Sequence, residues 1–106
     1  MPLVRTGPAQ KTQLDKVIAK AIRKLGKETV RVNYSFGEDS TGEASVFFRI
    51  LLTDAASRED KLLGTIGRIE KTLTDEIRPQ ENWGLLSYFS FRSKSEQEGR
   101  NDPEWG

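Results

Sequence analysis

The longest apolar run in the chain lies at residues 43–54, which read Glu-Ala-Ser-Val-Phe-Phe-Arg-Ile-Leu-Leu-Thr-Asp. The run is rich in β-branched and aromatic residues, and it is too short for a helix that spans a membrane. Such a run is typical of a strand at the centre of a sheet. We therefore predict a central strand here, and this strand needs cover on at least one face.

Two further strands flank this run. Residues 29–36 alternate throughout, with Val30, Val32, Tyr34 and Phe36 on one side and polar residues on the other. Residues 37–42, Gly-Glu-Asp-Ser-Thr-Gly, have the composition of a turn, so this strand and the central strand form an antiparallel hairpin. A last strand is predicted at residues 85–92, after an Asn-Trp-Gly turn.

Two segments have the spacing of amphipathic helices. In residues 9–25 the apolar positions recur at intervals of three and four, and a glycine follows where helices commonly end. These positions are Leu14, Val17, Ile18, Ala21, Ile22 and Leu25. The second helix is predicted to begin at a cap, either Asp54 or Ser57, and to run through to Arg78, where Pro79 closes it. Its apolar stripe consists of Leu62, Ile66, Ile69, Leu73 and Ile77.

The predicted fold class is α+β, a single two-layer domain at residues 1–92 in the order α-β-β-α-β. A helical connection makes the last two strands parallel, so the three-stranded sheet is mixed. Both helices cover one face of this sheet. The side chains expected on that face are Val30, Val32, Tyr34, Val46, Phe48, Ile50, Leu52, Phe89 and Phe91. Residues 93–106 are polar and charged, which predicts a disordered tail.

Two alternative folds depend on particular residues. If Leu3–Thr6 formed a first strand, the pattern would become ferredoxin-like, β-α-β-β-α-β, although this stretch is short and polar for a central strand. The sequence Gly64-Thr-Ile-Gly67 resembles the G-x-x-G loop of type II KH domains, which separates two helices and contacts RNA. Ile66, however, keeps the helical phase of Leu62 and Ile69, which favours one continuous helix.

Composition excludes several classes of function. The 106-residue chain has no cysteine and no histidine, so it lacks disulfides, thiolate metal ligands and the usual base of Ser-His or Cys-His catalysis. The sequence shows no apolar signal region and no run of about 18 apolar residues, which predicts a cytoplasmic protein without a membrane partner. We predict no cofactor, no metal and no enzymatic activity.

The net charge of +1 hides an uneven distribution. Residues 1–30 contain seven lysines and arginines against two acids, whereas residues 31–60 contain three against six. On the first helix, four basic residues fall on the side opposite the apolar stripe. These candidate contacts for nucleic acid are Lys16, Lys20, Arg23 and Lys27.

The sheet face away from the helices is the main candidate site. Alternation places on it Arg31, Asn33, Phe47, Arg49, Leu51, Tyr88 and Arg92. Arginine and aromatic residues are enriched in protein interfaces, so we predict a partner-binding face formed by Arg31, Phe47, Arg49, Tyr88 and Arg92. The same residues would also suit the stacked bases of a single-stranded nucleic acid. A third alternative is that the tail or a loop folds back over them.

Two catalytic alternatives depend on few residues. The acidic loop residues Glu38, Asp39 and Glu43, with Asp54, would offer oxygen ligands to a hard cation, as in a carboxylate-metal enzyme, although they match no EF-hand spacing. Removal of the initial methionine would leave Pro2 as an N-terminal proline, as in tautomerases. Those chains continue directly into a strand, and the residues after Pro2 make a poor strand.

Three segments carry a resemblance to other proteins. Asp39-Ser-Thr-Gly42, Val46-Phe-Phe-Arg49 and Tyr88–Glu96 together resemble a group of short bacterial α+β proteins. The resemblance covers the hairpin and the last strand and implies no activity. It does imply that Arg49, Arg92 and Glu96 act together.

The sequence therefore predicts a small non-enzymatic binding module that acts through the sheet face away from the helices. Its expected partner is a second copy, as a homodimer, or another protein, as for a small antitoxin or an operon-encoded accessory protein. The alternative is a domain that binds RNA or single-stranded nucleic acid through the basic helix and the arginine–aromatic face. A carboxylate-metal enzyme is the third candidate.

Overall fold

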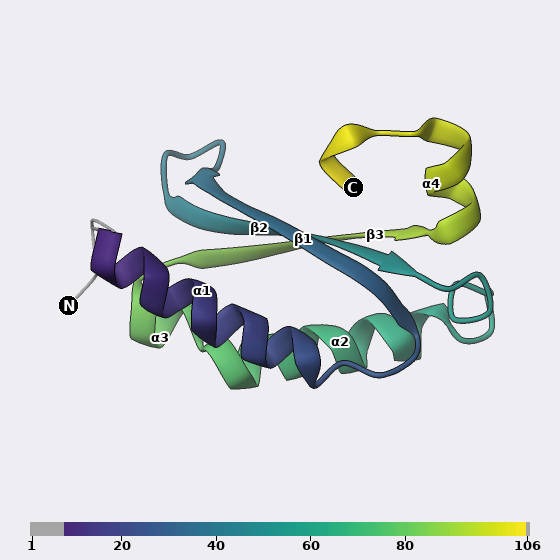
Figure 1. Ribbon diagram of the computed structural model, residues 1–106, viewed down its shortest axis with the longest axis horizontal. Coiled ribbons are helices and arrows are strands. Elements are labelled where there is room, and N and C mark those ends of the chain that lie inside the picture. The colour runs from purple at the N-terminus through teal and green to yellow at the C-terminus, as the bar shows by residue number, and fades with distance from the viewer. Residues whose placement is uncertain (1–7, 106) are drawn as a thin grey trace.

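The computed structural model describes residues 8–105 as an α+β fold around a mixed three-stranded sheet, which confirms the predicted fold class (Figure 1). Its strands are β1 (Thr29–Glu38), β2 (Ala44–Leu52) and β3 (Leu86–Ser93). Its helices are α1 (Pro8–Arg23), α2 (Leu62–Ile77), α3 (Pro79–Trp83) and α4 (Lys94–Arg100), and a 3-10 turn, η1 (Pro103–Trp105), follows them. Among the described residues, no helix has the length and apolar character needed to cross a membrane. Pro2 and the candidate strand Leu3–Thr6 lie outside the described residues.

The central strand is β2, which pairs with β1 in antiparallel orientation and with β3 in parallel orientation. Helices α1 and α2 lie side by side under one face of the sheet (Figure 1). The most buried apolar side chains come from α1, β2 and α2: Leu14, Ile18, Val46, Phe48, Ile50, Leu52, Leu73 and Ile77. An ion pair of 3.0 Å between Lys24 Nζ and Glu76 Oε1 joins the end of α1 to α2.

Val30 does not face the helices, contrary to the prediction from alternation. The register shifts between Thr29, which opposes Leu52, and Arg31, which opposes Leu51. This β-bulge sets Val30 out of phase, and its side chain is 42% exposed. The alternation of apolar and polar residues continues unchanged through this part of the sequence, so the pattern alone does not indicate the bulge.

Helix α2 begins at Leu62, later than predicted, because both predicted cap residues form other hydrogen bonds. Asp54 binds the C-terminal part of the chain, and Ser57 donates its hydroxyl to the carbonyl of Thr53 at 3.0 Å. Residues 54–61 form turns, and Lys61 precedes the helix without a side-chain cap.

Gly64 and Gly67 lie within α2, which is continuous through both positions. A Cβ added at Gly67 would meet nothing within 4 Å, whereas one at Gly64 would lie 3.3 Å from Nη1 of Arg68. We therefore expect Gly67→Ala to stabilise the fold by about 1 kcal/mol, because alanine has the higher helix propensity, and Gly64→Ala to stabilise it less. Denaturant unfolding checks both values. Destabilisation by Gly67→Ala would contradict a regular helix at this position.

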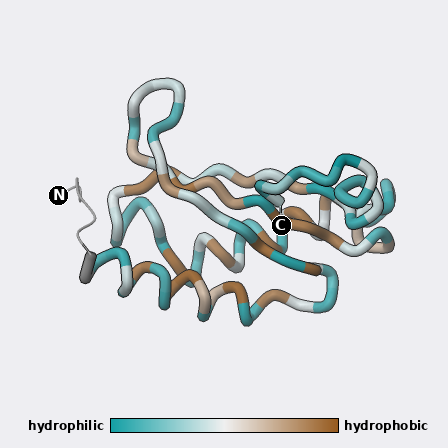
Figure 2. Tube along the Cα trace, turned by 45° about the horizontal axis from the view of Figure 1, so that its top comes forward, coloured by the Kyte–Doolittle hydropathy of each residue, from teal (hydrophilic) through white to brown (hydrophobic). Residues whose placement is uncertain are grey.

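The polar tail is folded, contrary to the predicted disorder. Residues 94–105 form α4 and η1 and turn back over the sheet face away from α1 and α2 (Figure 1). We call residues 94–105 the C-terminal arm. The arm is hydrophilic along most of its length (Figure 2), which is why its composition predicts disorder. One large apolar side chain of the arm is nevertheless buried, because Trp105 is only 8% exposed.

Candidate protein-interaction face

The sheet face away from α1 and α2, which we call the open face, carries the side chains that alternation placed there. The strand register sets these side chains in three adjacent rows across β1, β2 and β3. The rows are Arg31–Leu51–Arg92, Asn33–Arg49–Ser90 and Ser35–Phe47–Tyr88. The C-terminal arm binds over the first row and part of the second, and the third row lies beside the β1–β2 hairpin loop.

Arg92 lies directly under the arm, with only 11% of its side chain exposed. Its Nη1 donates to Gln97 Oε1 at 2.7 Å and to Asp102 Oδ2 at 2.9 Å. Its guanidinium carbon lies 4.3 Å from the centroid of the Trp105 ring. A guanidinium stacked on an aromatic ring is attracted by the ring quadrupole, and the attraction grows as water is excluded. Arg92 therefore binds the arm through charge, hydrogen bonds and ring contact at once.

Three further side chains of the open face hold the main chain of the arm. Arg49 Nε and Asn33 Nδ2 both donate to the carbonyl oxygen of Glu104, at 2.9 and 3.1 Å. Arg31 Nε donates to the carbonyl oxygen of Trp105 at 3.3 Å. These donors come from β1 and β2, whereas Arg92 comes from β3. The end of the arm is thus bound by all three strands.

The start of the arm is fixed by side chains around the first turn of α4. Ser93 Oγ accepts a hydrogen bond from the backbone N–H of Glu96 at 3.1 Å, which makes Ser93 an N-cap. Asp54, in the loop after β2, accepts from the backbone N–H of Ser95 at 3.0 Å and also from its hydroxyl. The Ser95 hydroxyl, followed by its N–H, holds the pKa of Asp54 below its usual value.

The third row of the open face is an aromatic pair. The rings of Phe47 and Tyr88 stack with centroids 5.5 Å apart and an interplanar angle of 15°. Tyr88 is 43% exposed, and its hydroxyl donates to Asp39 Oδ2 at 2.6 Å. This hydrogen bond to a carboxylate raises the pKa of Tyr88. The predicted residues Phe47 and Tyr88 therefore remain accessible beside the arm, while Arg31, Arg49 and Arg92 all bind it.

Asp39 organises the hairpin loop. Its Oδ1 accepts hydrogen bonds from the backbone N–H and hydroxyl of Thr41, at 2.9 and 2.7 Å, and from the backbone N–H of Glu43 at 3.0 Å. The Tyr88 hydroxyl, followed by these donors, holds the pKa of Asp39 far below its usual range. Within residues 8–105 no three acidic side chains gather closely enough to bind a metal ion. The loop that suggested a cation site is therefore organised by hydrogen bonds of its own.

The features that suggested nucleic-acid binding, which are the glycine pair, the basic helix and the arginines of the open face, do not form one surface in the structure. Because Gly64 and Gly67 lie inside α2, and the break between α2 and α3 falls at Arg78, no glycine loop separates these helices. The basic residues of the first helix and its end are exposed and, in the described part of the chain, form no ion pair: Lys16, Lys20, Arg23 and Lys27. They lie on or directly after α1, in the layer of helices (Figure 1). The arginines of the open face contact the arm on the other side of the sheet.

Sequence reasoning missed the residues that bring the arm onto the face. These are Asp54, Ser95, Asp102 and Trp105. One local signal was present, since Ser93-Lys-Ser-Glu96 has the S-x-x-E spacing of a helix start. Glu96, which the resemblance grouped with Arg49 and Arg92, lies within the arm and pairs with Arg100 at 3.2 Å.

Comparison with known proteins adds no further information. No protein-family model, curated protein or solved structure matches this chain. Function must therefore be inferred from the geometry of the open face.

Proposed function

We propose that this chain is a non-enzymatic protein-interaction module whose open face binds a peptide segment that combines acidic residues with a tryptophan. The free chain holds its own arm in this place. A partner would supply an equivalent segment, either the arm of a second copy or a similar segment of another protein. The observation that carries the proposal is the set of donors from Asn33, Arg49 and Arg31 to the main-chain carbonyls of Glu104 and Trp105.

The chemistry of these contacts supports recognition of a separate peptide. Carbonyl oxygens are present in every peptide, so the donors on β1 and β2 would bind an incoming chain as they bind the arm. Selectivity would come from Arg92, which combines a ring contact with Trp105 and an ion pair with Asp102. Arginine and tryptophan are the residue types that dominate binding energy in protein interfaces.

Nucleic acid has less support as the ligand. Within the described residues, Arg92 contacts a carboxylate and a tryptophan ring and Arg49 contacts a main-chain carbonyl oxygen, which are groups that a peptide supplies. The basic residues of α1 would form a separate footprint on the opposite layer. Exposed basic residues without ion pairs are also common on the solvated face of an ordinary helix, so they do not by themselves indicate nucleic-acid binding.

The proposal predicts that a peptide spanning residues 99–105 binds the Trp105→Ala variant, whose own arm is weakened. If arm docking contributes roughly 3 kcal/mol and a tethered segment has a local concentration in the millimolar range, the free peptide should bind with a Kd on the order of tens of micromolar. Wild-type protein should bind the same peptide roughly 100-fold more weakly, because its own arm competes. Fluorescence anisotropy of a labelled peptide measures both values.

Two matched controls test the chemistry. A peptide with alanine in place of its tryptophan should bind at least about tenfold more weakly, because it lacks the ring that contacts Arg92. Adding Arg49→Ala to the Trp105→Ala protein should also weaken binding, because it removes a donor to the Glu104 carbonyl. Equal binding of the two peptides, or no binding near 1 mM, would contradict the proposal.

A further inference from the structure

Strand β3 has a free edge. It pairs with β2 alone, and in the described residues no backbone hydrogen bond from another segment reaches Leu86–Ser93. Within residues 8–105, the outward N–H and C=O groups of this eight-residue strand therefore lack a backbone partner. A row of unpaired backbone groups is a template for an added strand.

The two edges of the sheet differ in how they discourage such pairing. Edge strand β1 contains a bulge between Thr29 and Arg31, and it also contains Gly37 and the charged Glu38. Strand β3, Leu-Ser-Tyr-Phe-Ser-Phe-Arg-Ser, has no proline, glycine, lysine or acid. Its single charge, Arg92, is paired with Asp102 under the arm. Bulges and exposed charges are the usual protection of an edge, and β3 has neither.

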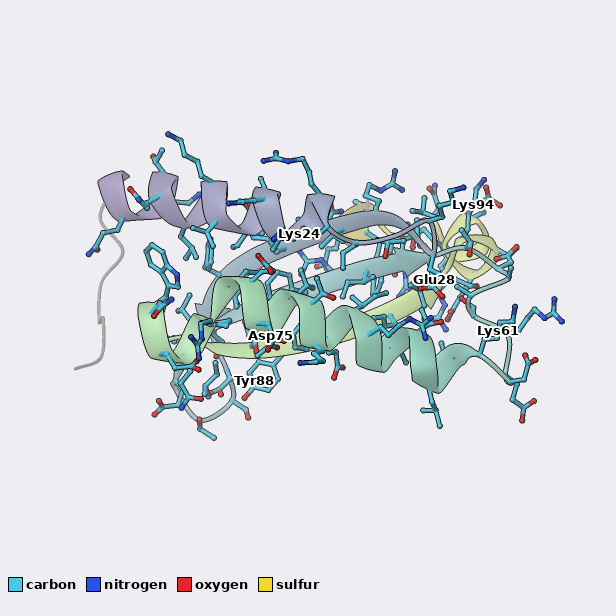
Figure 3. All side chains as sticks on the ribbon, turned by 90° about the horizontal axis from the view of Figure 1, so that it is seen from below. Lys24, Glu28, Lys61, Asp75, Tyr88 and Lys94 are labelled. Atoms are coloured by element: carbon cyan, nitrogen blue, oxygen red, sulfur yellow. The ribbon has the colours of Figure 1, made fainter. Side chains whose placement is uncertain are left out.

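Two hollows lie along the seam between β3 and α2, one near each end of the strand. The first, of about 260 Å³, is walled by Thr74, Pro79, Leu85, Leu86 and other residues near the start of β3. The second, of about 270 Å³, is walled at the other end by residues that include Leu62, Ile66 and Phe91. Figure 3 places Tyr88 at this edge of the sheet, away from α1. The linings also include polar side chains, among them Gln80, Glu81 and Glu96, but each hollow has an apolar part, against which an incoming strand could place apolar side chains on its helix side.

Strand β3 itself has such side chains. Phe89 and Phe91 pack against the core on the helix side, while Tyr88 and Ser90 lie on the open face and are exposed. We propose that the β3 edge pairs with the β3 edge of a second copy, in antiparallel orientation about a two-fold axis that passes beside Ser90, near the middle of the strand, so that Ser90 of one copy lies opposite Ser90 of the other. The two sheets would join into one continuous sheet, and the backbone groups at the free β3 edge of each copy would be hydrogen-bonded to the other copy. The helix-side phenylalanines of each copy would pack toward the hollows of the other.

The charges near the strand ends are compatible with this arrangement. Glu81 pairs with Arg78 just before β3, and Glu96 pairs with Arg100 just after it. An antiparallel arrangement brings the start of one strand beside the end of the other. Each acid can therefore lie beside a base of the second copy. The pairing uses the backbone edge of β3 and its helix side, whereas Arg92 of the same strand holds the arm on the open face, so the inference goes beyond the peptide-binding function.

The test compares lysine substitutions on the two edges. Wild-type protein should show a concentration-dependent rise in mass, from the monomer's 12.0 kDa toward twice that value, by light scattering up to about 1 mM. Ser90→Lys places like charges opposite each other in the pair and should raise the dimer dissociation constant at least about tenfold. Val30→Lys, an exposed position on the other edge strand, should leave it unchanged. A wild type that stays monomeric, or equal effects of the two lysines, would overturn the inference.

Cross-linking gives an independent readout, because the chain contains no cysteine of its own. Ser90→Cys should form an interchain disulfide on oxidation, whereas Val30→Cys should not, and the opposite result would overturn the pairing. Trp105→Ala separates this dimer from one formed by exchange of arms. The β3 dimer should persist in that variant. A dimer lost with Trp105→Ala but kept with Ser90→Lys would overturn edge pairing and would leave the peptide-binding function standing.

Discussion

Replacing Trp105 with alanine should lower the free energy of unfolding by roughly 3 kcal/mol and the melting temperature by roughly 10–20 °C. The ring is 8% exposed and lies against the guanidinium of Arg92, so its loss leaves the arm without its main apolar contact. Release of the arm would also expose Leu51, a side chain of the open face that is now 2% exposed. Denaturant and thermal unfolding followed by circular dichroism measure both quantities.

Glu104 provides the matched control for this change. The open face binds its backbone carbonyl, through Arg49 and Asn33, and alanine keeps that carbonyl. Its side chain is exposed, so Glu104→Ala should change stability by no more than about 0.5 kcal/mol. An unchanged melting temperature for Trp105→Ala, or an equal loss for Glu104→Ala, would show that the arm is not held as described.

Replacing Arg92 with alanine should cost roughly 2 kcal/mol, because the change removes the ring contact and leaves Asp102 and Gln97 without their shared donor. The loss should not add to that of Trp105→Ala. Both changes release the same arm, so the double variant should be little less stable than Trp105→Ala alone, with a coupling of roughly 1–2 kcal/mol.

A core substitution shows whether this coupling is specific to the arm. Leu73 lies in α2, on the other side of the sheet, and is fully buried. Leu73→Ala should destabilise by roughly 2–5 kcal/mol, and its effect should add to that of Arg92→Ala within about 0.5 kcal/mol. Full additivity between Arg92 and Trp105 would instead mean that the two residues act separately, against the contacts seen here.

The hairpin and the last strand were predictable because each is encoded by its own local pattern. In β1 and β2 one face packs on the helices and the other carries mostly polar and aromatic side chains, so a slip of one residue would exchange the two faces, and alternation specifies the register strongly. Pro79 likewise marks the end of α2 correctly. The orientation of Val30 was predicted wrongly, because the bulge that displaces Val30 leaves the alternation of the sequence unchanged.

The sequence offered the folded arm only as one alternative, in which the tail folds back over the face, because the order of the arm depends on contacts between distant segments. Asp54 and Ser95 are 41 residues apart, and Arg31 and Trp105 are 74 apart. Each partner alone has an ordinary role: Asp54 resembles a helix cap, and Trp105 resembles a stray aromatic residue in a polar segment. Only the fold brings the two sets together, and it also decides which part of the predicted face remains accessible.

The sequence separation of these contacts has a kinetic consequence. Contacts between Arg49 and Glu104, or between Asn33 and Glu104, span 55 and 71 residues, so forming them closes long loops of chain. They also require β1, β2 and β3 to be aligned beforehand, so we expect the arm to dock after the rate-limiting step of folding. Interactions absent from the transition state change the unfolding rate and leave the folding rate almost unaffected. The arm should therefore prolong the lifetime of the folded domain without hastening its formation.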